Sequence, residues 1–238
     1  PLPEIWEMSM KYGAEAMRRP VEIEFACNVN ADKTGDFYLL QVRPIVDSKQ
    51  MLDEDVAAVP DEECLLRSHN SLGHGISEDI TDVVYVKYDD RFSAMNHGRV
   101  VDDIERINDK FLASGAHYVI IGPGRWGSRD PWLGVPVKWP HISAARVIVE
   151  VALKNYRVDP SQGTHFFQNL TSFGVGYFTV DTNYPGDGGL LRKDILDAMP
   201  AVEETEFVRH VRFDKPLKIM MDGKKQEGVV MLGKNMGR

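Results

Sequence analysis

Two carboxylates, an amide and a guanidinium lie close together near the start of the chain, at Glu22, Glu24, Gln41 and Arg43. Carboxylate and amide oxygens are hard ligands of the kind that Mg²⁺ prefers. A guanidinium donates two parallel hydrogen bonds to a phosphate group. If the fold brings these four side chains together, they suit a nucleoside triphosphate and its metal ion.

Two β-rich runs separated by a polar loop would position these residues. The segment 21–44, VEIEFACNVNADKTGDFYLLQVRP, predicts an antiparallel hairpin with its loop at 30–36. If the loop closes symmetrically, Glu24 lies opposite Gln41 and Glu22 lies opposite Arg43. Strict alternation then predicts two faces. The apolar face would hold Val21, Ile23, Phe25, Cys27, Tyr38, Leu40 and Val42, and the other face would hold Glu22, Glu24, Ala26, Phe37, Leu39, Gln41 and Arg43.

A second interpretation of the polar face remains open. Strand faces that point into water often hold opposite charges on neighbouring strands. A solvated face with a cross-strand pair between Glu22 and Arg43 explains the same pattern without a ligand.

The pattern E-I-E-F, a short loop, and F-Y-L-L-Q-V-R-P resembles the end of the ATP-binding domain in the phosphoenolpyruvate synthase and pyruvate phosphate dikinase family. There, an acidic-x-Glu strand and a Leu-Gln-x-Arg strand close an ATP-grasp site. Glu22 matches the first acidic position, where family members often have Asp. The resemblance implies that Glu24 and Gln41 face metal and phosphates and that Arg43 supports phosphate transfer. It covers roughly the first fifth of the chain.

The resemblance also implies an activity and its participants. It points to an ATP-dependent phosphotransferase, or kinase, that uses ATP and Mg²⁺, with pyruvate or phosphoenolpyruvate as its substrate. In this family the phosphate-covering loop and the adenine pocket lie upstream of the matched motif. Because the chain begins at Pro1, we expect a C-terminal piece of a longer polypeptide that includes the upstream ATP-grasp half. The piece alone is expected to be inactive.

Composition excludes several classes of protein. The 238 residues have a formal net charge of −8, which argues against general binding to nucleic acid or to anionic membranes. No apolar run approaches the ~18 residues of a transmembrane helix, and no signal peptide is visible. Cys27 and Cys64 lack metal-ligand spacing, so reduced thiols in a cytoplasmic protein are expected.

The predicted fold class is α/β (α+β), organised in three segments. Residues 1–50 would form the C-terminal element of an ATP-grasp sheet, beginning with a helix at 3–19 whose apolar stripe is Ile5, Met8, Tyr12 and Ala16. Residues 51–63 are acidic and would be a solvated linker. Residues 64–238 would form a larger mixed α/β domain of unknown function. Its predicted strands are 82–88, 117–121, 135–139, 145–153, 172–180 and 207–213, with helices at 100–112 and 189–199 and a hairpin at 218–232.

A glycine-rich loop at 122–132, GPGRWGSRDPW, follows the predicted strand 117–121. Arg125, Ser128 and Arg129 are anion donors, and glycines permit close backbone approach, so a phosphorylated ligand could bind at 122–130. The module would then be regulatory rather than catalytic. The spacing matches neither the Walker pattern nor the dinucleotide fingerprint. A rigid loop, in which an arginine pairs with Asp130 and the tryptophans pack, is the open alternative.

Two histidine segments complete the candidates. Thr164 and His165 lie at the predicted start of a short helix that could hold an anion, although a histidine beside two phenylalanines is more often structural. Ser68-His69 matches two residues of the phosphohistidine motif of the resembled enzymes, then departs at Asn70. The segments 121–137 and 160–170 resemble a region that replaces the phosphohistidine domain in certain bacterial synthase-like proteins, for which no activity is implied.

Overall fold

The computed structural model describes residues 2–17, 21–32, 34–44, 54–87, 96–128, 130, 132–152, 170, 174–181 and 189–233. The chain divides into two compact units, residues 1–47 and residues 48–238. We call them the hairpin unit and the sheet unit. The fold mixes helices and strands, with strands in the majority.

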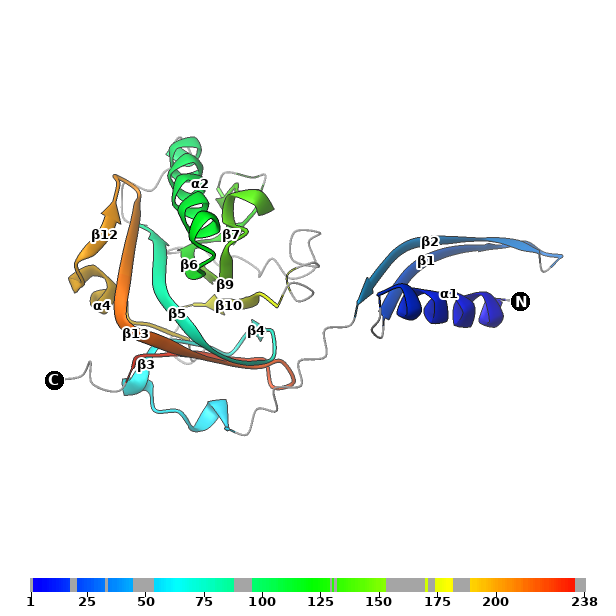
Figure 1. Ribbon diagram of the computed structural model, residues 1–238, viewed down its shortest axis with the longest axis horizontal. Helices are drawn as coiled ribbons and strands as arrows, with labels where there is room; N and C mark the ends of the chain where they lie inside the picture. The colour runs from blue at the N-terminus through cyan, green and yellow to red at the C-terminus, as the bar shows by residue number, and fades with distance from the viewer. Residues whose placement is uncertain are drawn as a thin grey trace. The chain divides into compact units, whose positions relative to one another are not determined.

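The hairpin unit contains one helix and two antiparallel strands (Figure 1). They are α1 (Leu2–Met17), β1 (Val21–Val29) and β2 (Gly35–Pro44). The predicted helix and hairpin are therefore confirmed. A Cβ atom at Gly13 of α1 would lie 3.0 Å from Val21 Cγ2 and 3.1 Å from Val42 Cγ1. The missing side chain lets α1 lie close against the two strands.

This close approach determines which side of α1 is covered. Met8 and Tyr12, expected in the buried stripe, are 51 % and 60 % exposed. Ile5, Ser9 and Gly13 are partly buried instead, spaced four residues apart on one side of the helix. The predicted stripe was wrong because apolar spacing cannot show that a glycine makes the closest contact.

The register of the hairpin is as expected near its open end and differs near the loop. Glu22 pairs with Arg43 and Glu24 pairs with Gln41, but Phe25 pairs with Leu39. Leu40 is thus an extra residue in β2, a β-bulge, and the faces of β2 switch there. Phe37 and Leu39 therefore share the face of Phe25, and Phe25 stacks on Phe37 with ring centroids 5.0 Å apart. Strict alternation had assigned Phe37 and Leu39 to the polar face.

The sheet unit is built on a ten-stranded sheet with the order β11-β3-β14-β13-β5-β6-β9-β10-β4, and β12 also pairs with β13. The pairs β5–β6, β6–β9 and β9–β10 are parallel, and the other pairs are antiparallel. The strands are β3 (Cys64–Ser68), β4 (Ser71–Leu72), β5 (Gly75–Val86), β6 (Tyr118–Pro123), β9 (Ala145–Val151), β10 (Gly176–Val180), β11 (Leu190–Leu191), β12 (Ala201–Glu204), β13 (Val208–Asp222) and β14 (Glu227–Met231).

Two helices cover opposite faces of this sheet (Figure 1). α2 (His97–Ser114) packs Ile104 on one face, and α4 (Lys193–Ala198) packs Leu196 on the other. Successive residues of a strand point to opposite faces of the sheet. Val84 therefore belongs to the apolar cluster that contains Ile104 of α2, and Val83 belongs to the cluster that contains Leu196 of α4. The central strand β6 is buried along its whole length, and β9 is buried at every position except Arg146, as is typical of parallel strands covered on both sides.

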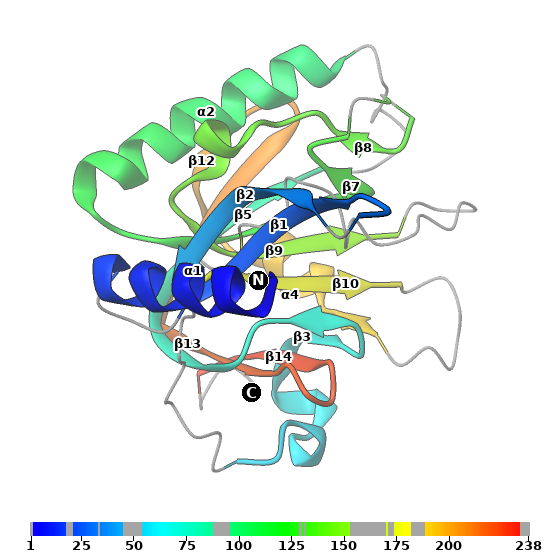
Figure 2. The ribbon, with the colours of Figure 1, turned by 90° about the vertical axis from the view of Figure 1, so that its right-hand side faces the viewer.

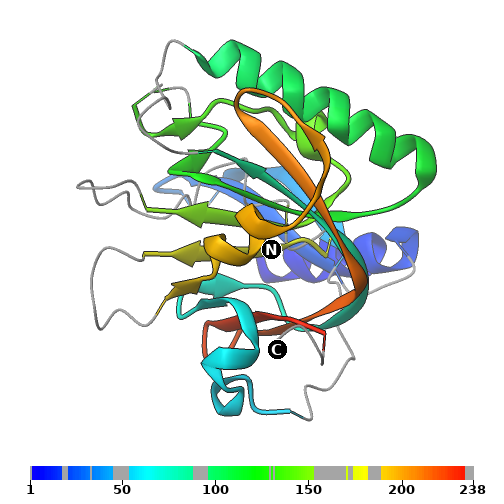
Figure 3. The same ribbon diagram turned by 90° about the vertical axis from the view of Figure 1, so that its left-hand side faces the viewer.

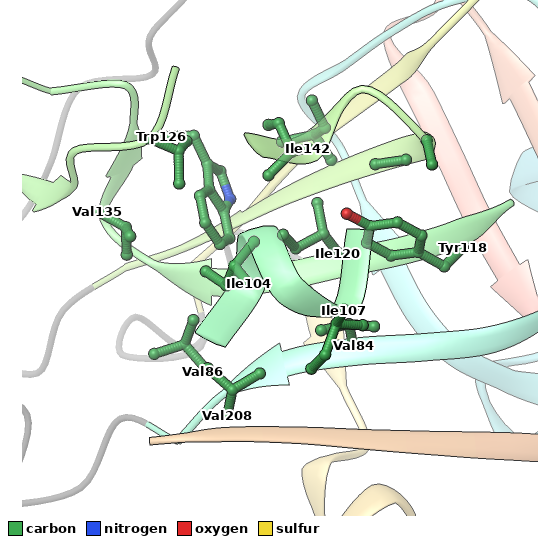
Figure 4. Packing of buried hydrophobic residues seen from close by; sticks show 14 of the residues in the cluster. Val84, Val86, Ile104, Ile107, Tyr118, Ile120, Trp126, Val135, Ile142 and Val208 are labelled. Atoms are coloured by element: carbon green, nitrogen blue, oxygen red, sulfur yellow. The ribbon is translucent and has the colours of Figure 1, made fainter. Parts of the chain in front are cut away.

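Smaller elements lie outside the ten-stranded sheet. β7 (Arg125–Trp126) and β8 (Gly134–Val135) form a separate parallel pair (Figure 2). A 3₁₀ turn, η4 (Trp139–Ile142), follows and contacts α2. Trp126, Val135 and Ile142 belong to the core between α2 and the sheet (Figure 4).

Several predicted elements differ in extent. β5 begins seven residues before the predicted strand 82–88, and the predicted strand 135–139 ends at Val135. The predicted strand 207–213 and the first arm of the hairpin 218–232 form one continuous strand, β13, drawn orange to red in Figure 3. Register shifts between Arg212 and Leu217 let β13 stay paired with β5. Polar residues at these irregular positions gave the appearance of a loop.

The acidic stretch 51–63, expected to be a solvated linker, is partly folded into the sheet unit. Two 3₁₀ turns form at η1 (Val56–Ala58) and η2 (Asp61–Glu63). Val56 is fully buried in a small apolar cluster. The buried Arg67 donates a hydrogen bond of 3.3 Å to the carbonyl of Val56. The apolar side chain and the buried arginine, rather than the acidic residues, decide the position of this segment.

In the ranges that the structure describes, no helix is both long enough and apolar enough to cross a membrane.

Candidate functional site

The residues that the sequence predicts to bind a nucleotide and its metal ion lie near the open end of the hairpin. Glu24 lies directly opposite Gln41, and Glu22 lies directly opposite Arg43. Directly paired residues of antiparallel strands have their side chains on the same face, with Cβ atoms about 5 Å apart. The side chains of Glu22, Glu24 and Gln41 are exposed. The fold thus brings these residue types together as the sequence predicted.

The backbone of Arg43 is placed by its pairing with Glu22, while its side chain lies outside the described part of the structure. Glu22 makes a further interaction, so it is not a free carboxylate. The alternative of a cross-strand pair between Glu22 and Arg43 therefore stays open.

The donor set of this face suits a metal that is shared with a nucleotide. Among the described residues, no group of three or more His, Cys, Asp or Glu side chains is placed to hold a metal ion. Mg²⁺ in nucleotide sites is usually held by one or two carboxylates together with phosphate oxygens and water. Glu24 and the amide of Gln41 fit such a partial set, in which the substrate supplies the remaining ligands.

The glycine-rich loop owes its glycines to packing. A Cβ atom at Gly122 would overlap the indole ring of Trp126, which is 2 % exposed. Gly124 has a φ of +63°, and a Cβ atom there would overlap the carbonyl of Leu133. Trp126 donates its indole N–H to the carbonyl of Val149 at 2.9 Å. These glycines make room for a buried tryptophan and for the turn between β7 and β8.

A buried carboxylate, that of Glu150 in β9, accepts a hydrogen bond from the same loop. Glu150 is 3 % exposed, and its Oε1 accepts the backbone N–H of Trp126 at 3.0 Å. Its Oε2 accepts the hydroxyl of Tyr177 at 2.6 Å. Arg125 also has an interaction partner. The loop is therefore held by hydrogen bonds to β9, and Tyr177 of β10 holds Glu150 in turn. The packing of Trp126 agrees with that part of the rigid-loop alternative.

The predicted anion donors of this loop have mixed outcomes. Ser128 donates to the carbonyl of Asp130 at 3.0 Å and accepts the N–H of Asp130 at 3.1 Å, so its hydroxyl serves the turn. Trp132 is 76 % exposed and does not pack. Arg129 lies outside the described residues. Anion binding here remains a prediction.

The two histidine segments have different outcomes. Thr164 and His165 lie outside the described residues. His69 lies between β3 and β4, and its Nδ1 is 2.8 Å from Glu227 Oε1 of β14. This contact gives His69 a structural partner.

A third polar group, which the sequence did not predict, lies beneath α2. Asp82 of β5 pairs directly with Arg212 of β13, and both share a sheet face with His210. Asp82 Oδ1 lies 2.6 Å from His210 Nε2 and 2.8 Å from Arg212 Nε, and Asp82 Oδ2 accepts the hydroxyl of Thr81 at 2.6 Å. Burial raises the pKa of Asp82, but the hydrogen bonds from His210, Thr81 and Arg212 outweigh it and lower the pKa below its ordinary value.

No local sequence motif indicates this polar group, because Asp82 and His210 are 128 residues apart in the sequence. The available signal is a polar residue among the apolar residues of a strand, Asp82 in DVVYVKY and His210 in VRHVRF. Buried polar residues at such positions need partners, which is a reason to look for them on another strand.

Comparison with known protein families, with curated protein sequences and with solved structures finds no match for this chain.

Proposed function

We propose that the hairpin unit contributes metal- and phosphate-binding residues to the ATP site of an ATP-dependent phosphotransferase similar to phosphoenolpyruvate synthase. The observation that supports this most directly is the register of the hairpin, which pairs Glu24 with Gln41 and Glu22 with Arg43. Had the extra residue of β2 been Val42 instead of Leu40, Glu24 would lie opposite Leu40 and Gln41 would be on the other face. As folded, the carboxylates and the amide share one exposed face.

The four residues would have different roles, which follow from the charge of each side chain. Glu24 and Gln41 would hold Mg²⁺, which when bound neutralises charge on the phosphates of ATP. Glu22 would support the same ligand set from the next position along β1. Arg43 would donate hydrogen bonds to the phosphates and stabilise the negative charge that develops on them during transfer. Phosphate transfer depends mainly on such positioning and charge neutralisation, which a rigid strand pair can supply.

The apolar surface of the hairpin unit supports a place within a larger nucleotide-binding domain. Among the described large apolar side chains, most of those that are exposed belong to this small unit: Leu2, Trp6, Met8, Tyr12, Phe25, Val29, Tyr38, Leu39 and Leu40. Surfaces of this kind usually pack against another segment or partner. In the proposal, the upstream half of the ATP-grasp domain packs here and brings the adenine pocket.

The alternative function, a regulatory module that senses a phosphorylated ligand at 122–130, has less support. The glycines at Gly122 and Gly124 are required by Trp126 and by the β7–β8 turn. Ser128 is engaged within its own turn. No described feature of this loop needs a ligand to explain it.

The test uses the polypeptide that contains this chain together with the upstream half of the domain. Calorimetric titration gives its affinity for MgATP, and a coupled assay gives the rate of phosphate transfer to pyruvate. We expect Glu24→Ala to weaken MgATP binding about tenfold or more, since it removes a metal ligand. We expect Arg43→Ala to slow transfer by about 100-fold, because it removes charge stabilisation of the transition state.

Glu15→Ala is the matched control, since Glu15 is an exposed carboxylate on α1 of the same unit. It should leave affinity and rate unchanged. The proposal fails if Glu24→Ala and Arg43→Ala also leave both quantities unchanged.

A further inference from the structure

We propose that the sheet unit binds a small 2-hydroxy carboxylic acid in a pocket beneath α2, between Arg212 and His210. This inference is independent of the proposed ATP site, which lies in the other unit. It depends on three observations: an oriented histidine with an open nitrogen, an arginine with unused donors, and an apolar pocket that both of them line.

Asp82 orients the histidine. His210 is 5 % exposed and lies 2.6 Å from Asp82 through Nε2. Because Asp82 is held as a carboxylate by its three hydrogen-bond donors, it accepts the proton on Nε2. In the neutral imidazole, Nδ1 is then the acceptor nitrogen. Phe111 of α2 contacts the ring, with centroids 5.3 Å apart, and limits its rotation.

The second nitrogen of His210 has no hydrogen-bond partner in the described part of the chain, and it is not sealed from solvent. A buried structural histidine normally satisfies both nitrogens. His210 also lines a pocket of about 240 Å³. The open Nδ1 is therefore placed to accept a hydrogen bond from a molecule in that pocket.

Arg212 supplies the charge for an anion. Its Nε donates to Asp82 at 2.8 Å, and its two Nη groups donate to no other described residue. Its side chain is 56 % exposed and lines the same pocket. A guanidinium fork in this state suits a carboxylate, which it can bind through two parallel hydrogen bonds.

Lys110 and Glu203 also line the pocket, but they are already paired with each other. Lys110 Nζ lies 2.5 Å from Glu203 Oε2, and Arg106 pairs with the other oxygen of Glu203. Arg212 is therefore the cation best placed to bind an anionic ligand here.

The rest of the pocket favours a short apolar group. Ile107 and Phe111 of α2 and Val202 of β12 form its walls. Its volume is below the roughly 300–1,000 Å³ of pockets that hold drug-sized molecules. A carboxylate for Arg212, a hydroxyl that donates to His210 Nδ1, and a small aliphatic side chain against the walls together describe a short 2-hydroxy acid.

The experiment compares pairs of acids that differ only in the hydroxyl. The full chain is titrated with glycolate, lactate and 2-hydroxyisovalerate, and with acetate, propionate and isovalerate, while the imidazole signals of His210 are followed by NMR. We expect at least one hydroxy acid to bind about tenfold more tightly than its hydroxyl-free partner, because the hydroxyl pairs with Nδ1. Saturable shifts should be centred on His210.

Two substitutions separate the contributions. Arg212→Gln should weaken binding of hydroxy and hydroxyl-free acids alike by about tenfold, since it removes the carboxylate partner. His210→Gln should remove the difference between the two series. Lys225→Gln is the control, because Lys225 is an exposed lysine in the turn between β13 and β14. It should change neither series.

Calorimetric unfolding of each variant establishes that it is folded before titration. Failure of all six acids to shift His210 in the folded wild-type chain would overturn the proposal. So would equal affinity for the two series in the wild-type chain, since that would leave Nδ1 without a role. Inorganic phosphate is the additional probe, and tighter binding of phosphate than of every hydroxy acid would also overturn the assignment of the ligand class.

Discussion

The hairpin unit and the sheet unit place their polar side chains in opposite ways. In the hairpin unit, Glu22, Glu24 and Gln41 are exposed on one strand face, and the chain that joins them is short. In the sheet unit, Asp82 and His210 are almost fully buried, and 128 residues separate them. The first arrangement depends on local register, whereas the second depends on the assembled sheet.

The difference teaches how polar groups relate to stability in each unit. An exposed carboxylate keeps its water, so replacing it changes the free energy of unfolding little. A buried carboxylate has lost its water, and its hydrogen bonds from protein groups compensate for that loss. Substitutions on the hairpin face should therefore change stability little, whereas substitution of Asp82 should destabilise the sheet unit.

The largest expected effect is at Asp82. Asp82→Ala should lower the free energy of unfolding of the sheet unit by about 3 kcal/mol, because it leaves the N–H of the buried His210 without its acceptor. Denaturant titration followed by circular dichroism measures this change. Glu206→Ala is the control, since Glu206 pairs with Arg99 on the surface and should cost less than about 1 kcal/mol. Equal effects at the two sites would remove the distinction between buried and exposed carboxylates.

A second effect tests whether packing explains the glycine-rich loop. Gly122→Ala should destabilise the chain by about 1–3 kcal/mol, because the added methyl group overlaps Trp126. At Gly98, in the first turn of α2, a Cβ atom meets nothing within 4 Å. Gly98→Ala should therefore stabilise the chain by up to about 1 kcal/mol. Thermal unfolding of both variants gives the comparison, and a neutral Gly122→Ala would contradict the packing account.

The pH dependence of stability gives a third test. The folded-state pKa of Asp82 lies below its ordinary value of 3.8. Its contribution to stability is therefore fully present above that value and is lost as the pH falls through the lower folded pKa. Urea titrations from pH 5 down to pH 2 should show this loss in the wild-type chain. Asp82→Asn should have a shallower acid dependence, and an unchanged slope would show that Asp82 is not ionised in the folded protein.

The smallest effect is expected on the hairpin face. Glu24→Ala should change the free energy of unfolding of the hairpin unit by less than about 0.5 kcal/mol, because the side chain is exposed. Denaturant titration of the same variant that is tested for MgATP binding gives this value. A loss of nucleotide affinity without a loss of stability would show that Glu24 serves ligand binding rather than folding. A large loss of stability would contradict the difference between the two units.

Secondary structure could be predicted from the sequence where apolar residues recur at a regular spacing. It could not be predicted where a strand contains a register shift. The helix at 100–112 follows a clear apolar period, and α2 forms there. The segment 145–153 is ambiguous in period, its β-branched residues favour a strand, and β9 forms there. The continuous strand β13 was divided in two, because Asp214, Lys215 and Pro216 resemble a turn. A register shift against β5 accommodates them. Sequence pattern cannot show such a shift, since it depends on the partner strand.

The sequence by itself determined the hairpin and the pairing of Glu24 with Gln41, because a short loop between two β-rich runs leaves few registers. Only the tertiary structure decided the bulge at Leu40, the burial of Trp126 against Gly122, and the meeting of Asp82 with His210. The physical reason is separation along the sequence. Side-chain periodicity is a local property, whereas contacts between distant strands depend on the packing of the whole sheet.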